Sequence, residues 1–165
     1  MVGPSEEAVS VSRRVAAPAA AIFAVLADPR RHRELDGSGM VRGAVSGGIV
    51  SGVGDVFVMA MHFAALGDYE MDNHVVEFEP DRRIAWEPAP GRGHPGWTPD
   101  RPQARWGHRW IFELVPDGPE ATVVTETYDC SRAPVEARAS VDGGRTWVAS
   151  MEATLARLDA VVTAG

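Results

Sequence analysis

Residues 144–162, GRTWVASMEATLARLDAVV, form the stretch of this sequence that most constrains its fold. Large apolar residues recur at intervals of three or four, which places them along one stripe of an α-helix: Trp147, Met151, Leu155, Leu158 and Val162. The other positions are mostly small or charged and suit a solvent-facing side. An amphipathic helix of this kind must bury its stripe against another layer. We therefore predict a long C-terminal helix that packs on a sheet formed by the upstream chain.

The upstream chain is predicted to form short strands joined by tight turns. Runs of apolar residues, several of them alternating with polar ones, predict strands at 9–15, 40–45, 56–63, 69–79, 84–86, 105–115 and 122–129. Two short helices are predicted after the first strand, at 18–27 and at 30–35, and the charges of the second indicate a mostly solvated segment. Turns such as 80–82 favour antiparallel pairing. The order of elements indicates an α+β fold.

Composition and charge exclude several classes of protein. The 165 residues, 45% of them apolar, fit one domain spanning 1–165. A net charge of -7 argues against a nucleic-acid or membrane partner, and no segment approaches the ~18 apolar residues that span a bilayer. The single cysteine, Cys130, cannot form an internal disulfide and fits a reducing compartment. We expect a cytoplasmic protein, and the sequence leaves open whether it forms a homodimer.

The strand predicted at 105–115 has the most clearly defined inner face. Every second side chain there is aromatic, aliphatic or imidazole: Trp106, His108, Trp110, Phe112 and Leu114. Burial among apolar groups disfavours the imidazolium ion, so we expect His108 to be neutral. A neutral His108 could act as a general base or orient a ligand carbonyl. The alternative is a structural histidine that hydrogen-bonds a neighbouring group, and the sequence leaves both roles open.

Other polar candidates carry weaker signals. His74 offers the same choice of roles, because it shares a predicted face with Val76 and Phe78. Glu126 and Tyr128 could supply an acid and a phenolic donor if their side of the strand faces inward. The alternative is a solvent-facing Glu126 beside a packed Tyr128, and the alternation does not decide between them. The histidines lack the spacing of metal ligands, so we expect no metal and no other cofactor.

Large apolar side chains could line a ligand cavity or could simply form the core. The candidates for ligand contact come from the strands and from the C-terminal helix: Met59, Met61, Trp86, Trp106, Trp110, Trp147 and Met151. A segment at 88–104, rich in proline and glycine, disfavours regular structure. Its length is typical of a lid or a contact surface around Trp97, although a solvated insertion is the alternative.

Several short segments spread over the chain carry a family resemblance. They are VAAP at 15–18 with Ile22-Phe23 and LADP at 26–29, VVEFEP at 75–80 with RIAW at 83–86, and WIFEL at 110–114 with VVTETY at 123–128. With them the chain resembles the START-like superfamily and, within it, bacterial polyketide cyclase/dehydrase-like proteins. The resemblance implies a helix-grip fold, in which a curved antiparallel sheet wraps around the long C-terminal helix. It also implies a cavity between them that often binds a hydrophobic small molecule.

Three functions follow from these expectations. The first is binding of a hydrophobic or aromatic small molecule between the sheet and the C-terminal helix. The second is a polyketide cyclase or aromatase that uses His108 as a general base, with Glu126 and Tyr128 as further candidates. The third is a protein-interaction module that uses the 88–104 loop, which departs from the short hairpin usual in the superfamily. The sequence does not decide whether the protein is an enzyme.

Overall fold

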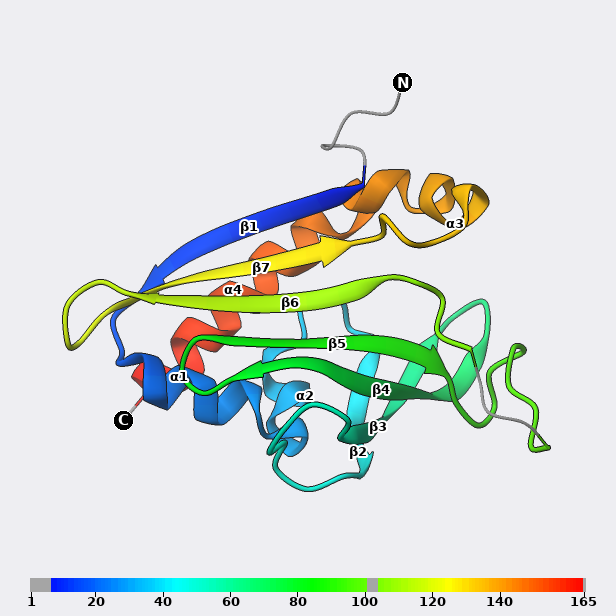
Figure 1. Cartoon of the computed structure of the whole chain (residues 1–165), viewed down its shortest axis with the longest axis horizontal. Helices are drawn as coiled ribbons and strands as arrows, with labels where there is room; N and C mark the ends of the chain where they lie inside the picture. The colour runs from blue at the N-terminus through cyan, green and yellow to red at the C-terminus, as the bar shows by residue number, and fades with distance from the viewer. Residues whose placement is uncertain (1–6, 101–103, 165) are drawn as a thin grey trace.

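The computed structural model describes residues 7–100 and 104–164 and shows one curved sheet with helices packed on it (Figure 1). The strands are β1 (Ala8–Val15), β2 (Val41–Ser46), β3 (Val56–Phe63), β4 (Gly67–Glu79), β5 (Arg83–Pro90), β6 (Arg109–Pro116) and β7 (Thr122–Asp129). They form an antiparallel sheet of seven strands in the order β1-β7-β6-β5-β4-β3-β2. This α+β arrangement with a long C-terminal helix confirms the predicted helix-grip fold.

The helical segments occupy three parts of the chain. They are α1 (Ala19–Leu26), η2 (Pro29–Arg31), α2 (His32–Leu35), α3 (Val135–Ser140), η3 (Asp142–Trp147) and α4 (Val148–Thr163). The two predicted helical regions after β1 are therefore confirmed, the second as η2 followed by α2. Between β7 and η3 the chain also forms α3, a helix that the sequence analysis did not predict. Within the described part of the chain, no helix is long and apolar enough to cross a membrane.

The helix α4 buries the stripe that its sequence predicts. Met151, Leu155 and Leu158 are at most 1% exposed, and α4 packs against β1, β7, α1 and α2. Figure 1 shows α4 lying across the sheet behind β6 and β7. The helix begins at Val148 rather than at the expected residue 144, because Gly143 and Gly144 have φ values of 62° and 100°. That left-handed backbone region cannot continue an α-helix.

The strand β5 is longer than its sequence indicates. It was expected to end near Trp86, but it continues to Pro90 and pairs with β4 as far as Met71. Its pairing with β6 ends at Trp86, so beyond that residue one edge of β5 is free. Pro88 and Pro90 are two residues apart, so their backbone nitrogens point to the same side of β5, which is this free edge. Proline has no N–H to donate, and on the free edge the sheet loses no hydrogen bond. The proline-rich loop therefore starts at 91.

A β-bulge in β4 puts His74 and Phe78, which were predicted to share one face, on opposite faces of the sheet. The register of β4 with β5 shifts between Val75 and Glu77, so the alternation of side chains changes at this point. Phe78 then packs on Phe23 in the core at a ring distance of 5.3 Å. His74 lies on the outer face, opposite Glu87. The prediction that His74 and Phe78 share a face is wrong, because a bulge cannot be read from the alternation alone.

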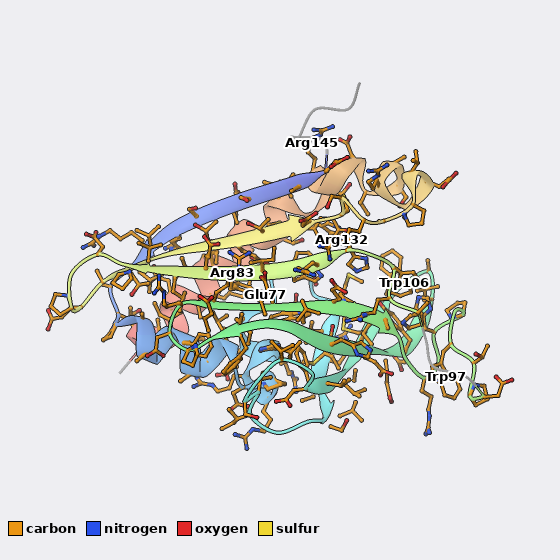
Figure 2. The ribbon with its side chains drawn as sticks, in the orientation of Figure 1. Glu77, Arg83, Trp97, Trp106, Arg132 and Arg145 are labelled. Carbon is orange, nitrogen blue, oxygen red and sulfur yellow. The ribbon has the colours of Figure 1, made fainter. Side chains whose placement is uncertain are left out.

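Ion pairs cover the outer face of the sheet over β4, β5 and β6. The Arg83 guanidinium contacts Glu77 at 2.7 Å and also pairs with Glu113 (Figure 2). Nearer the end of β5, Arg109 Nη2 lies 2.6 Å from Glu87 Oε2. Charged side chains of opposite sign therefore cover this face, while the face toward α4 carries the aromatic residues. The apolar interior of the molecule lies between the inner face and the helices.

Candidate ligand-binding cavity

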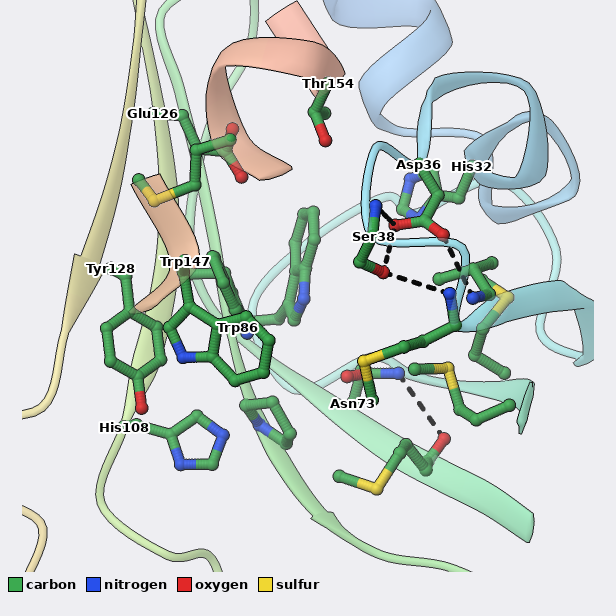
Figure 3. A pocket seen from close by; sticks show the side chains of 18 of the residues that line it. His32, Asp36, Ser38, Asn73, Trp86, His108, Glu126, Tyr128, Trp147 and Thr154 are labelled. Carbon is green, nitrogen blue, oxygen red and sulfur yellow. Dashed lines mark hydrogen bonds between the residues drawn. The ribbon is translucent and has the colours of Figure 1, made fainter. Parts of the chain in front are cut away.

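A cavity of about 480 Å³ lies between the inner face of the sheet and the helices (Figure 3). This volume is within the range of ~300–1,000 Å³ that is usual for small-molecule sites. The largest lining side chains are aromatic or methionine, and they come from β3, β4, β5, β6, the segment before β6, β7, η3 and α4: Phe57, Met59, Met61, Met71, Trp86, Trp106, Trp110, Phe112, Tyr128, Trp147 and Met151. The space is therefore large, apolar and built from elements that are distant in sequence.

The structure brings together almost all of the residues that the sequence singled out. Those that line the cavity are Met59, Met61, Trp86, Trp106, His108, Trp110, Glu126, Tyr128, Trp147 and Met151. His74 does not belong to this group, because it lies on the outer face of β4. There its neighbours are charged, and burial together with the nearby Arg105 lowers its pKa.

Aromatic rings form a continuous wall along β5, β6 and β7. Trp86 faces Trp110 across the β5–β6 pair, and Trp110 faces Tyr128 across the β6–β7 pair. The ring centroids of Trp110 and Tyr128 are 4.7 Å apart, and Trp147 at the end of η3 lies 6.2 Å from Trp110. Trp86 also stacks on Phe112 at 5.7 Å. Such a wall presents flat, polarisable faces to the cavity.

His108 lies at the end of the cavity formed by the segment before β6. Its ring stacks on Trp106 with centroids 5.6 Å apart and an interplanar angle of 11°, and Tyr128 lies at 5.6 Å on another side. This burial lowers the pKa of His108 to about 4, so the imidazole is neutral at pH 7. No hydrogen bond joins its ring nitrogens to another described residue. A neutral ring facing the cavity was the expectation from the sequence.

Glu126 faces the cavity from β7 and is only 4% exposed. Its oxygen Oε2 is buried and has no hydrogen-bond partner among the described residues. Burial, with a smaller contribution from the charge of Asp36, raises the pKa of Glu126 to about 8, so this carboxyl is mostly protonated at pH 7. The alternative of a solvent-facing Glu126 is therefore wrong. Tyr128 lies on the same face, and burial raises its pKa to about 12.

A polar rim that the sequence analysis missed is formed by residues 36–41 and α4. The Asp36 carboxylate accepts hydrogen bonds from the Ser38 hydroxyl at 2.6 Å and from the backbone N–H of Val41 at 3.0 Å (Figure 3). The Gly37 N–H donates to Thr154 Oγ1 on α4 at 3.0 Å. The sequence Asp-Gly-Ser-Gly at 36–39 is typical of a turn, but nothing in it indicates that α4 and a cavity lie beside that turn.

His32 was also missed, because the charges around it predicted a solvated helix. The residue is 9% exposed, and its Nε2–H donates to the backbone oxygen of Leu26 at 2.8 Å. Its ring stacks on Trp86 with centroids 5.3 Å apart. Burial lowers its pKa, so His32 is a neutral structural residue in the cavity wall. The prediction of a mostly solvated segment is therefore wrong for His32 and for the buried Leu35, while Arg30 and Arg33 are exposed.

Part of the proline-rich loop contributes to the cavity. His94 lines it and packs between Trp106 at 5.0 Å and Tyr69 at 5.5 Å. Trp97 is not one of the lining residues and lies out on the loop, whereas Trp106 lies at the end of the sheet (Figure 2). Residues 101–103 of the predicted loop lie outside the described residues. A contact surface around Trp97 stays a prediction.

The polar groups of the cavity are few and are not grouped for metal binding. Across residues 7–100 and 104–164, no group of three or more histidine, cysteine, aspartate or glutamate side chains is placed to hold a metal ion. Neither arginine nor lysine occurs among the described lining residues. The arrangement can exclude water, enclose an apolar ligand and offer it hydrogen bonds at a few fixed points.

Comparison with known proteins gives a family and several structural relatives. The profile of the family described as polyketide cyclase / dehydrase and lipid transport matches residues 6–163. The uncharacterized protein Rv0088 of Mycobacterium tuberculosis is 37% identical over 160 residues, a match that covers 91% of this chain and 62% of the relative. A second uncharacterized protein of that species, MT0096, is 36% identical with the same coverage. The chain thus spans about three fifths of the length of these curated relatives.

Solved structures show the same fold at low sequence identity. Protein Ms6760 of Mycobacterium smegmatis is 15% identical with a TM-score of 0.70, covering 99% of this chain and 96% of that one. The major latex-like protein 151 of Panax ginseng is 11% identical with a TM-score of 0.66, covering 94% and 97%. These likenesses concern the fold, which is that of START-like helix-grip proteins. With a profile match over residues 6–163, the chain belongs to the polyketide cyclase/dehydrase and lipid transport family.

Proposed function

We propose that this protein binds a hydrophobic or aromatic small molecule in the cavity between the sheet and α4. The observation that carries the proposal is the 480 Å³ space itself, lined by tryptophan, methionine and phenylalanine side chains. Protein interiors are close-packed, and voids larger than a water molecule are few, since their walls lose dispersion contacts. A space of this size among large apolar side chains is therefore better explained by a ligand than by core packing.

Binding can be measured through the tryptophans of the cavity. Four of the five tryptophans, Trp86, Trp106, Trp110 and Trp147, line it, so a bound fluorophore accepts energy from them. We expect the uncharged probe N-phenyl-1-naphthylamine to bind with a micromolar dissociation constant and to quench tryptophan emission. The variant Met61→Trp should weaken binding at least about tenfold, because the larger side chain fills part of the space. Val56 is 42% exposed on the same strand, so Val56→Trp is the matched control. No saturable quenching in the unmodified protein would refute the proposal.

A second candidate function, a cyclase or aromatase, is favoured by one observation. The neutral His108 ring faces the cavity and has no hydrogen bond from another described residue, so it is available to accept a proton from a substrate. Glu126 is opposite Phe112 on β6. Phe112 comes four residues after His108, which at ~3.3 Å per residue is roughly 13 Å along the backbone. Tyr128 is the closer group, with its ring centroid 5.6 Å from that of His108, so His108 would work beside Tyr128.

The enzymatic candidate predicts a clear loss of activity in one variant. If a poly-β-keto thioester is cyclised by the protein, we expect His108→Ala to lower kcat by roughly 100-fold or more while the unfolding temperature stays close to that of the parent protein. His62→Ala is the matched control, because His62 is on β3 outside the cavity and pairs with the exposed Asp68. Equal turnover by the His108→Ala variant and the parent protein would remove His108 from the mechanism.

A further inference from the structure

Glu126 is a buried carboxyl in an aromatic wall. Its oxygen Oε2 meets neither a cation nor a hydrogen-bond donor among the described residues. Glu126 is 4% exposed and lines the cavity (Figure 3). An unpaired buried polar group costs stability, so such a group indicates a partner supplied from outside the fold. On the basis of the proposed ligand-binding function, we propose that the ligand carries a basic nitrogen, and that it binds as an ammonium ion against Glu126.

The strand register places aromatic side chains around this carboxyl. Phe112 is directly opposite Glu126 on β6, and Tyr128 follows two residues later on the same face of β7. Trp110 pairs with Tyr128 and is therefore diagonal to Glu126. Ring faces attract an ammonium group through their quadrupole, and the attraction is stronger where water is excluded. A cation at Glu126 would thus meet both an opposite charge and aromatic faces.

The other charges of the cavity also favour a cation. Asp36 is the second carboxylate in the lining, and its charge contributes to the raised pKa of Glu126. No arginine or lysine is present among the described lining residues, and the entire sequence contains no lysine. A ligand with a carboxylate or phosphate would therefore bring a negative charge toward two acidic side chains without any cation to pair with it. The cavity selects against anionic lipids and for amines.

Amine binding at this site should depend on pH. A free ammonium ligand and a protonated Glu126 hold two protons between them, whereas the ion pair holds one, so binding releases a proton below pH 8. The affinity for the amine should then rise by up to about tenfold per pH unit from pH 6 to pH 8. The other titratable groups that line the cavity are His32, Asp36, Tyr69, His94, His108 and Tyr128. Burial favours the neutral form of the histidines and tyrosines in this set, so they stay uncharged over most of this range.

Three ligands of nearly equal shape test the inference. Calorimetric titrations of the protein with 2-naphthylmethylamine, 2-naphthylmethanol and 2-naphthoate compare an ammonium, a hydroxyl and a carboxylate on one ring system. At pH 8 we expect the amine to bind roughly 10–100-fold more tightly than the alcohol, and the carboxylate to bind most weakly. Titrations in buffers of different ionisation enthalpy should show about one proton released per amine bound at pH 7.

Two variants separate the carboxyl from the rest of the cavity. In Glu126→Gln the amine should lose its advantage over the alcohol, while Glu152→Gln, a change at an exposed position of α4, should leave that advantage intact. Equal binding of amine and alcohol by the parent protein, or a preference for the carboxylate, would overturn the inference and leave the proposed function standing. Failure of the uncharged N-phenyl-1-naphthylamine and of all three ligands to bind would instead refute the proposed function, and the inference with it.

Discussion

The variant Glu126→Gln is expected to be more stable than the parent protein at pH 8, with an unfolding temperature roughly 10 °C higher. The reason is that a glutamate in this position must either ionise without a partner in an apolar wall or keep its proton. Glutamine has nearly the same shape and no charge. The effect should appear in the ligand-free protein, and it can be measured by thermal or urea unfolding between pH 4 and pH 8.

The sign of the pH dependence follows from the direction of the pKa shift. The pKa of Glu126 is about 8 in the folded protein and near the ordinary glutamate value of 4.5 in the unfolded chain. Between these values the folded state binds the extra proton, so stability falls as the pH rises, by about 1.4 kcal/mol per pH unit. The difference in stability between variant and parent should therefore grow by on the order of 4 kcal/mol from pH 4.5 to pH 8.

Other titrations do not obscure this difference. His108 has a lowered pKa in the fold, so its contribution to stability is present above pH 6.5 and is lost as the pH falls toward 4. That contribution is common to both proteins and cancels when they are compared. The matched control is Glu152→Gln on the exposed side of α4, for which we expect no pH-dependent gain. A constant difference between Glu126→Gln and the parent protein over this pH range would contradict the burial of Glu126.

The second large effect is expected for Gly37→Ala, which should lower the stability by about 3 kcal/mol. A Cβ at this position would lie 2.4 Å from the Ser150 backbone oxygen and 2.7 Å from the Thr154 backbone nitrogen. Both are backbone atoms of α4, so neither can move aside without displacing the helix. The turn would move away instead and would lose the hydrogen bonds from Gly37 N–H to Thr154 and from Arg157 to the Asp36 backbone oxygen.

A second glycine provides the control for this prediction. A Cβ at Gly48 meets no atom within 4 Å, and the residue has an ordinary backbone conformation. Gly48→Ala should therefore change the stability by less than about 0.5 kcal/mol. Chemical unfolding of the two variants and the parent protein measures both effects. Equal stability of the Gly37→Ala and Gly48→Ala variants would show that residues 36–39 do not approach α4 as closely as the structure indicates.

Much of the fold could be predicted from the sequence because its strongest signals are local. The stripe of Met151, Leu155 and Leu158 predicted both a helix and its buried side, and both are confirmed. The alternation of Trp106, His108, Trp110 and Phe112 likewise predicted one inner face, and all four residues line the cavity. For α4, and for Trp110 and Phe112 of β6, the period of the side chains is fixed by the backbone geometry of a single element. The predicted strand at 105–115 is wrong at its start, because β6 begins at Arg109 and Gly107 has a φ of 89°, so Trp106 and His108 reach the cavity from irregular backbone.

The predictions for the end of β5 and for the face of His74 are wrong because both depend on the neighbouring strand and not on the local pattern of residues. Pro88 and Pro90 were predicted to end β5, but they lie on an edge that β6 leaves unpaired. The bulge after Val75 moved His74 away from the side of Phe78. The local sequence shows neither where a neighbouring strand ends nor where the register of a pair shifts.

The side on which Glu126 lies shows the limit most clearly. The alternation on β7 is nearly symmetric, with Val124, Glu126 and Tyr128 on one face and Val123, Thr125 and Thr127 on the other, so the sequence favours neither. Pairing of Glu126 with Phe112 of β6 turns the carboxyl toward α4 and the cavity. The sequence by itself determined the elements, their apolar faces and the helix-grip resemblance, because these depend on periodicity within one segment. Only the tertiary structure decided which polar groups enter the cavity, because that depends on the pairing of strands far apart in the chain.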